Sequence, residues 1–237
     1  MTDRLGPYLL GPNDTPENGI YTGDARELAK AIPDASVDLI FTDPVYDRIE
    51  DYRWLAETAA RVLRLTGAVL VWSNGKWHHR NTCWLEDGGL CWRYTFANVM
   101  VGGPQPMCGK IIAKSNRVLW LDRNNDSRMA KYLADGLITT NRNDLAKGFK
   151  WSKSPRMTAD AMRCFLGIVL DPFVGGGTVP AVCKMLGRRY LAFEIDPDTA
   201  ELARERVRNT QPPLFVPEPV QQEMRLDDGT RGDQCET

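Results

Sequence analysis

Short apolar segments alternate with amphipathic segments along most of the chain. Residues 37–42, 68–72 and 168–171 are short and mostly apolar on both faces, as buried parallel strands are. Residues 51–65 carry apolar side chains at helical spacing, and Gly67 follows them as a stop, which indicates a helix. Strands separated by helices predict a doubly wound α/β sheet that binds ligands at the carboxyl ends of its strands.

The same patterns predict the remaining elements, and no internal repeat is visible. Asp196 and Pro197 supply an N-cap and a first helical residue for the last helix. We expect further strands at residues 20–24, 94–101, 118–121 and 189–196, and further helices at residues 158–166, 178–186 and 198–209.

One strand end is suited to a cofactor. The segment Ile168-Val-Leu-Asp-Pro-Phe-Val-Gly-Gly-Gly-Thr178 ends an apolar run in an acid and three glycines, which let the backbone approach a ligand. A dinucleotide fingerprint would have a glycine where Pro180 stands. Asp171 favours a positive ammonium or sulfonium group, because a carboxylate would repel a pyrophosphate. Glu194 ends the next strand, where an acid can accept hydrogen bonds from ribose hydroxyls or simply end the strand. This combination favours S-adenosylmethionine, which has a ribose and no phosphate.

Two motifs resemble those of a known family. Asp171-Pro-Phe-Val-Gly-Gly-Gly-Thr178 resembles the D-P-F-x-G-x-G-T cofactor motif, and Thr42-Asp-Pro-Val-Tyr46 the D-P-P-Y catalytic motif, of amino-group DNA methyltransferases. The catalytic motif comes first, as in the permuted beta group of that family. Residues 23–28 and 193–196 also fit the pattern, so that the resemblance covers residues 20–209. It implies a Rossmann-like class I methyltransferase sheet, mostly parallel with an antiparallel edge strand and with a circularly permuted motif order.

The resemblance also implies the residues of the site, with S-adenosylmethionine as the cofactor and no metal ligand. The catalytic candidates are Asp43, Pro44 and Tyr46. The cofactor-binding candidates are Asp24, Ser152, Asp171, Phe173, Gly175, Gly177, Thr178 and Glu194.

The catalytic candidates suit transfer to an exocyclic amine. The lone pair of adenine N6 is delocalised into the ring, so the enzyme must favour a pyramidal nitrogen with acceptors for its two hydrogens. The Asp43 carboxylate and the Pro44 carbonyl would be those acceptors, and Asp43 would stabilise the positive charge that develops during attack. Tyr46 would stack on a base that has left the duplex. An ordinary strand-ending turn with a packing tyrosine is the alternative interpretation.

Two departures from the family pattern stand out. Val45 replaces the usual second proline, which keeps the carbonyl of the preceding residue but relaxes its conformation, so we predict activity. A catalytically silent, nucleic-acid-binding subunit is the alternative. Where the family has H-P-T-Q-K-P, Ser152 aligns, but Ser154 takes the usual place of lysine and Lys153 lies one position early. The resemblance assigns this segment to the methionine carboxylate of the cofactor.

Charge is concentrated locally although the net charge is −1. Residues 110–156 contain eleven basic residues and four acids, a local excess of +7. Such a segment attracts phosphates, which predicts DNA as the partner, although a solvated basic face is the alternative. Within it, residues 122–151 are a short basic insertion that we interpret as the target-recognition element.

The chain is long enough for one full-sized domain. We expect a single methyltransferase domain at residues 1–210, with a catalytic half at 19–121 and a cofactor-binding half at 152–210. Residues 211–237 are acidic and rich in proline and glutamine, which predicts a disordered tail.

The remaining sequence features predict a cytoplasmic protein that has no contact with a membrane. No apolar stretch approaches a membrane span, and the N-terminus lacks a signal-peptide pattern. The six cysteines form no C-x-x-C pair, which favours reduced thiols, and no common zinc module matches the histidines and cysteines of residues 78–91. A homodimer and a partner restriction endonuclease stay open.

The function predicted from the sequence is site-specific transfer of a methyl group to adenine N6 in DNA. Asp43 at the head of the catalytic motif favours adenine, because serine is commoner there in the cytosine N4 enzymes of the family. Cytosine N4 is the alternative.

Overall fold

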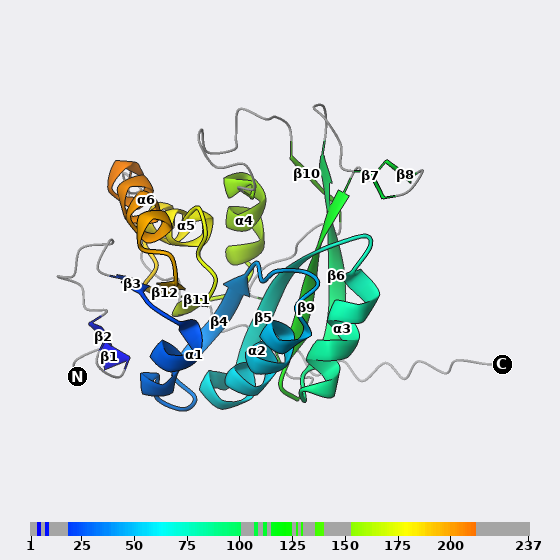
Figure 1. Ribbon diagram of the computed structural model, residues 1–237, viewed down its shortest axis with the longest axis horizontal. Coiled ribbons are helices and arrows are strands. Elements are labelled where there is room, and N and C mark those ends of the chain that lie inside the picture. Colours follow the sequence, from blue (N-terminus) through cyan, green and yellow to red (C-terminus); the bar gives the residue numbers. More distant parts are fainter. Residues whose placement is uncertain are drawn as a thin grey trace, which may run out of the picture.

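The computed structural model describes residues 4–5, 8–9, 19–100, 107–108, 111–112, 115–124, 127, 129, 136–139 and 153–211. An eight-stranded sheet in the order β10-β6-β9-β5-β4-β11-β12-β3 crosses the molecule (Figure 1). In chain order its strands are β3 (Ile20–Thr22), β4 (Val37–Thr42), β5 (Leu63–Asn74), β6 (Cys91–Met100), β9 (Ser115–Asp122), β10 (Gly136–Thr139), β11 (Val169–Asp171) and β12 (Tyr190–Glu194). Two short antiparallel pairs lie outside this sheet: β1 (Arg4–Leu5) with β2 (Tyr8–Leu9), and β7 (Met107–Cys108) with β8 (Ile111–Ile112).

The predicted doubly wound, mostly parallel sheet is confirmed, with one difference in the position of its antiparallel strand. That strand is β9, which pairs antiparallel with both β5 and β6 and therefore lies inside the sheet rather than at its edge. The edge beside β6 is occupied by β10, which is parallel to its neighbour. The sequence pattern of a strand gives its burial but not its neighbours, so this position could not be predicted.

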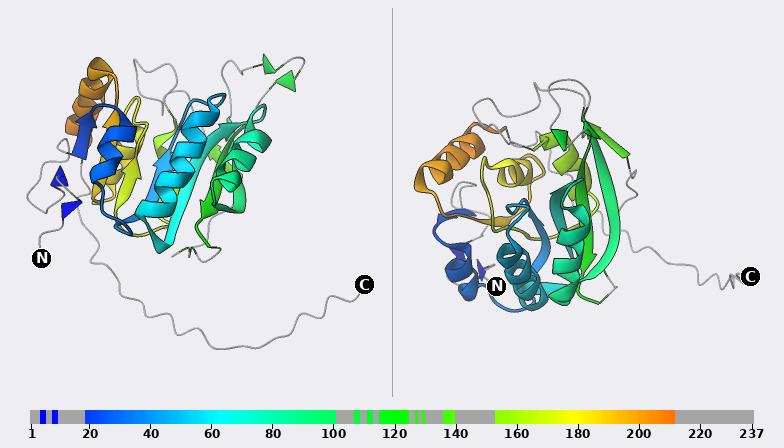
Figure 2. Two further views of the ribbon diagram at one scale, coloured as in Figure 1. Left: turned by 60° about the horizontal axis from the view of Figure 1, so that its bottom comes forward. Right: turned by 45° about the vertical axis from the view of Figure 1, so that its right-hand side comes forward.

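Helices cover both faces of the sheet (Figures 1 and 2). On one face lie α1 (Ala25–Leu28), the short 3-10 helix Ala29–Ala31, α2 (Ile49–Val62) and α3 (His78–Asp87). On the other face lie α4 (Pro155–Met162), α5 (Thr178–Met185) and α6 (Pro197–Asn209). Side chains of the central strand β4 alternate between the two cores, with Ile40 in the first and Phe41 in the second.

Three helices differ from the expectation. The helix predicted at residues 51–65 is α2, which ends at Val62 because β5 begins at Leu63. The helix predicted at residues 158–166 is α4, which begins earlier because the Ser154 side chain caps it. No helix was predicted where α3 lies, since Asn81 and Leu85 are its only buried residues and its sequence is largely polar.

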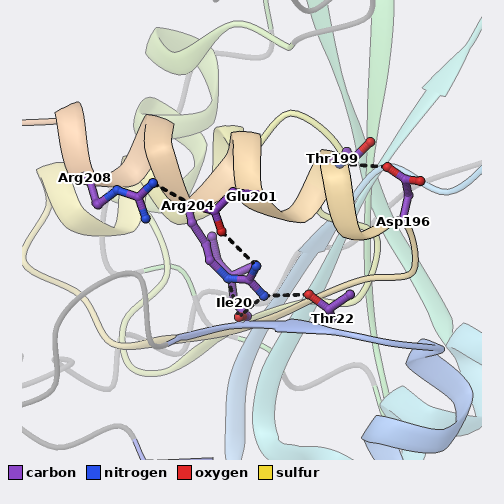
Figure 3. Close-up of polar contacts among 7 residues, drawn as sticks. All are labelled: Ile20, Thr22, Asp196, Thr199, Glu201, Arg204 and Arg208. Carbon is purple, nitrogen blue, oxygen red and sulfur yellow. Dashed lines mark hydrogen bonds and ion pairs between the residues drawn. The ribbon is translucent and has the colours of Figure 1, made fainter.

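The edge strand β3 is fastened to α6 by one arginine (Figure 3). Arg204 donates to the backbone carbonyl of Ile20 at 3.1 Å and to the hydroxyl of Thr22 at 2.6 Å, and it pairs with Glu201 at 3.3 Å. At the other end of α6, the Asp196 carboxylate accepts from the backbone N–H of Thr199 at 2.7 Å, which confirms the predicted N-cap. These contacts hold the strand that leads to Asp24 against the cofactor half of the fold.

A search of the described residues found no helix with the length and apolar character that a membrane crossing requires. The division into catalytic half, recognition insertion, cofactor half and tail stays a prediction, because much of residues 122–151 and nearly all of residues 211–237 lie outside the described residues.

Candidate active site

The two motif-bearing strands are neighbours in the sheet. β4 and β11 pair in parallel, with Leu39 opposite Val169 and Ile40 opposite Leu170, so their carboxyl ends meet at one rim. Next to this pairing, the buried Thr42 hydroxyl donates to Asp171 Oδ1 at 2.7 Å. The loops that carry the two motifs therefore leave the sheet side by side.

Asp171 is a buried acid with few partners. Its carboxylate also accepts from the backbone N–H of Phe173 at 3.2 Å. Burial raises the pKa of Asp171 to about 7, although the hydrogen bonds from Thr42 and Phe173 oppose that rise. A positively charged ligand nearby would favour the ionised form, as expected for a carboxylate that faces a sulfonium.

The three-glycine loop contains one position with open space and one that serves packing. Gly175 has φ +48°, and a Cβ placed on it would meet nothing within 4 Å. Gly177 has φ +71° and precedes α5, and a Cβ there would lie 2.9 Å from Ala203 Cβ of α6. Gly175 therefore leaves room for a ligand beside the backbone, whereas Gly177 lets α5 and α6 approach each other.

Glu194 at the end of β12 joins the surrounding loops. Its Oε2 accepts from the backbone N–H of Gly175 at 2.8 Å, and its Oε1 accepts from that of Asp196 at 3.1 Å. Its backbone carbonyl accepts from Gly23 at 2.8 Å. Asp24 follows Gly23 and caps α1 by accepting from the backbone N–H of Arg26 at 2.8 Å. The structure thus gathers the predicted acids of β3, β11 and β12 at one rim of the sheet.

The other predicted cofactor residues differ in what they contact. Phe173 packs edge-on against Trp54 of α2, with ring centres 5.7 Å apart. The Thr178 hydroxyl accepts from Arg206 of α6 at 2.9 Å, and the same guanidinium nitrogen donates to the carbonyl of Gly176 at 2.6 Å. In this structure Thr178 thus contributes to the packing of α6 on the loop. Ser152 lies outside the described residues.

The catalytic candidates surround a lysine. Lys153 Nζ lies 2.5 Å from Asp43 Oδ2 and donates to the Tyr46 hydroxyl at 3.0 Å. Asp43 Oδ1 is buried and has no hydrogen-bond partner among the described residues. Burial and, to a smaller extent, the Asp43 carboxylate raise the pKa of Tyr46 far above its ordinary value, so Tyr46 is a neutral phenol. A buried acceptor beside an aromatic ring fits a planar ligand that brings its own N–H group.

Residues 44 and 45 complete this strand end. Pro44 is buried, whereas the Val45 side chain is 49% exposed and its carbonyl accepts from the backbone N–H of Arg48 at 3.2 Å. The valine that replaces the second proline therefore takes no part in the core.

Sequence reasoning missed the position of Lys153. The family pattern assigned its segment to the cofactor's methionine carboxylate, whereas the structure places the ammonium of Lys153 on Asp43 and Tyr46. The shift of this lysine by one position from the pattern was the only available signal.

Most of the basic segment at residues 110–156 lies outside the described residues. Of its described members, Arg123 donates to the carbonyl of Leu63 at 2.7 Å and so has a structural role. A second group of cations, which was not predicted, follows the carboxyl end of β5. Lys76 and Arg80 lie 5.1 Å and 5.6 Å from the ring centre of Trp77, and both are exposed.

The residues considered for zinc form one weak contact in this part of the structure. His79 Nε2 and Cys83 Sγ are 3.9 Å apart. Within the described ranges, no three histidine, cysteine or acidic side chains are grouped so that they could hold a metal ion.

Comparison with known sequences points to DNA methylases. The N6/N4 methyltransferase family model, described as DNA methylase, matches residues 155–205. The type II methyltransferase M.BamHI of Bacillus amyloliquefaciens is 24% identical over 280 residues, which cover 87% of this chain and 60% of the relative. The type II methyltransferase M2.LlaDCHI of Lactococcus lactis subsp. cremoris is 24% identical over 263 residues, which cover 85% of this chain and 94% of the relative. This chain therefore spans less than two thirds of M.BamHI but nearly all of M2.LlaDCHI.

Comparison with solved structures shows the same fold. The complex of M1.HpyAVI with S-adenosylmethionine aligns with a TM-score of 0.66 and 21% identity, over 79% of this chain and 98% of the other. The cytosine-N4-specific PvuII DNA methyltransferase aligns with a TM-score of 0.70 and 16% identity, over 79% and 85%. TTHA0409, a DNA modification methylase of Thermus thermophilus solved with S-adenosylmethionine, aligns with a TM-score of 0.60 and 20% identity, over 79% and 92%.

Proposed function

We propose that this chain, whose family match and type II relatives support an amino-group DNA methyltransferase, transfers a methyl group from S-adenosylmethionine to adenine N6 in DNA. The observation that carries the proposal is the hydrogen bond between Thr42 and Asp171 at 2.7 Å. It joins the strand that presents the catalytic motif to the strand that presents the cofactor motif. Methyl transfer needs these two sites in contact, because one carbon passes directly between donor and acceptor.

The residues at the rim fit the cofactor that the family uses. Gly175 leaves open space where a side chain would stand, and Glu194 presents a carboxylate for ribose hydroxyls beside it. Asp24 and Asp171 add two acids on either side of Glu194 in the sheet order. When bound, S-adenosylmethionine supplies a methyl group made electrophilic by its sulfonium, and these acids would favour a cation over a phosphate.

The acceptor side prepares an amine. Asp43 Oδ1 is buried and lacks a hydrogen-bond partner among the described residues, so an amine hydrogen would satisfy it. The carboxylate would stabilise the positive charge that grows on the nitrogen and guide the proton away after transfer. The Pro44 carbonyl would accept the second hydrogen, and the neutral Tyr46 ring would stack on the extruded base.

Adenine is proposed as the base because Asp43 heads the catalytic motif. Cytosine N4 is the second candidate, and the likeness to the cytosine-N4-specific PvuII enzyme, at a TM-score of 0.70, favours it. DNA is the proposed partner in either case. A cytoplasmic location is proposed with them, since DNA and S-adenosylmethionine meet there in a cell without a nucleus.

A transfer assay separates the candidate functions. The protein is incubated with tritiated S-adenosylmethionine and unmodified DNA, and the DNA is digested to nucleosides. We expect N6-methyladenine. N4-methylcytosine in its place would assign the second candidate, and absence of both from a folded protein that binds the cofactor would indicate a silent nucleic-acid-binding subunit.

A variant pair tests the role of Asp43. D43N should abolish transfer and leave cofactor binding unchanged, since the amide loses the charge that stabilises the developing cation. D47N, the same change at an exposed acid four residues further on, is the matched control and should retain full activity. Turnover by D43N would remove Asp43 from the proposed role.

A further inference from the structure

We infer that Lys153 reads the target base, by donating a hydrogen bond to the ring nitrogen beside the amine that Asp43 accepts. The inference rests on the proposed function and adds a specificity-determining residue to it. It starts from the ion pair between Lys153 Nζ and Asp43 Oδ2, which are 2.5 Å apart.

The two oxygens of Asp43 have different surroundings. Oδ2 holds the ammonium of Lys153, whereas Oδ1 is buried and without a partner among the described residues. Asp43 and Lys153 therefore present an unused acceptor and a charged donor side by side. The Lys153 side chain is only 15% exposed, so the pair lies in a site of restricted solvent access, where such hydrogen bonds discriminate strongly.

Lys153 leaves the face of Tyr46 open. Its ammonium lies 3.0 Å from the Tyr46 hydroxyl but 5.4 Å from the centre of the ring. These two distances place the ammonium beyond the hydroxyl, close to the ring plane, rather than over the ring. A base stacked on Tyr46 would therefore meet Lys153 and Asp43 at its edge, without first displacing the lysine from the aromatic face.

A second aromatic ring fixes the lysine. The ammonium lies 5.6 Å from the ring centre of Trp72, which is buried in β5 beside β4. The attraction of the cation to this ring and the ion pair with Asp43 both hold the side chain in place. A donor held in this way loses little conformational entropy when a base binds.

The pattern of the pair matches the bases that carry an exocyclic amine. In adenine the amine is flanked by the ring acceptors N1 and N7, and in cytosine it is flanked by N3. In guanine and thymine a carbonyl oxygen takes the place of this amine, so it would face Asp43 and leave two acceptors in contact. Lys153 and Asp43 together would therefore admit adenine or cytosine and exclude guanine and thymine.

The test replaces the ring nitrogens of adenine one at a time. DNA is copied with 7-deaza-dATP or 1-deaza-dATP in place of dATP, so that every adenine carries the analogue and the target sequence need not be known. The kcat/KM for methyl transfer is measured for the unsubstituted protein and for K153M, with K153R as the variant that keeps the charged donor. K30M, the same change at an exposed lysine whose helix leads into the amino end of β4, is the matched control.

We expect one of the two analogues to lower kcat/KM of the unsubstituted protein and of K30M about tenfold or more, the size expected for a hydrogen bond from a charged donor. K153M should respond less to that analogue than the unsubstituted protein does, and K153R should recover part of the difference. The inference is overturned if adenine and both analogues react equally well with the unsubstituted protein, or if K153M keeps the full difference.

A binding measurement separates failure of this inference from failure of the proposed function. The affinity of the same DNA samples is measured with sinefungin in place of S-adenosylmethionine, which requires no transfer. If no DNA is methylated, the proposed function fails, but a loss of affinity with one analogue that disappears in K153M would still support the inference. Equal affinities for all DNA samples, or absence of binding, would reject it.

Discussion

Thr42 and Asp171 are 129 positions apart in the sequence, yet the hydroxyl of one donates to the carboxylate of the other at 2.7 Å in the core. This contact joins the last residue of β4 to the last residue of β11. Because both residues are buried and belong to paired strands, the contact fixes the separation of the two motif loops at the rim. The following predictions test the parts of this rim.

Asp171 should make the stability of the protein depend on pH. Its pKa in the folded state is about 7, against 3.8 as the ordinary value. The folded state therefore binds a proton more tightly than the unfolded state, so this stabilisation is complete below about pH 4 and is lost progressively as the pH rises to about 7. Between pH 5 and pH 8 the unfolding free energy should fall by about 1–3 kcal/mol relative to D171N, as measured by urea denaturation. D198N, at an exposed acid, should behave as the unsubstituted protein does.

The glycines of the loop should separate stability from cofactor binding. G177A should lower the unfolding free energy by about 2–4 kcal/mol, because its Cβ would press on Ala203 and its φ of +71° is strained for alanine. G175A should cost about 1–2 kcal/mol for its φ of +48° and should weaken S-adenosylmethionine binding, since its Cβ enters the open space. Thermal unfolding and calorimetric titration measure the two effects. Equal cofactor affinity in G175A and the unsubstituted protein would place the ligand elsewhere.

Glu194 should be needed for cofactor affinity. Its carboxylate accepts from Gly175 and Asp196 and carries the charge proposed to bind the ribose hydroxyls. E194Q should weaken S-adenosylmethionine binding about tenfold or more, because each hydrogen bond to a charged group contributes about 1.5–3 kcal/mol. The dissociation constant can be measured by calorimetry. E205Q, at an exposed acid of α6, serves as the comparison and should bind normally.

Lys76 and Arg80 should contact DNA phosphates. Both are exposed cations on either side of the Trp77 sequence position, just beyond the carboxyl end of β5, which neighbours β4 in the sheet. The double variant K76Q/R80Q should reduce the slope of log affinity against log salt concentration by about 2, since each neutralised phosphate contributes about 0.9. DNA binding is measured by fluorescence anisotropy over a range of salt concentrations. An unchanged slope, equal to that of K30Q, would exclude these cations from the DNA interface.

The sequence by itself determined the strands and the order of the motifs. The apolar runs that become β4, β11 and β12 are each followed by residues that a strand interior disfavours, so their ends could be placed closely. The glycines and acids at those ends predicted a cofactor class, because torsional freedom and charge are local properties. A largely polar sequence hid α3, whose burial depends on the sheet and α2 beneath it.

Only the tertiary structure decided which of these residues touch. The interior position of β9 depends on hydrogen bonds to two strands, and the contact of Lys153 with Asp43 joins residues from the two halves of the chain. Thr178 illustrates the converse, since its place in a motif predicted a ligand contact and its hydroxyl accepts instead from Arg206. Local sequence fixes the conformation of a segment, whereas the partner of a side chain is set by packing between segments distant in the chain.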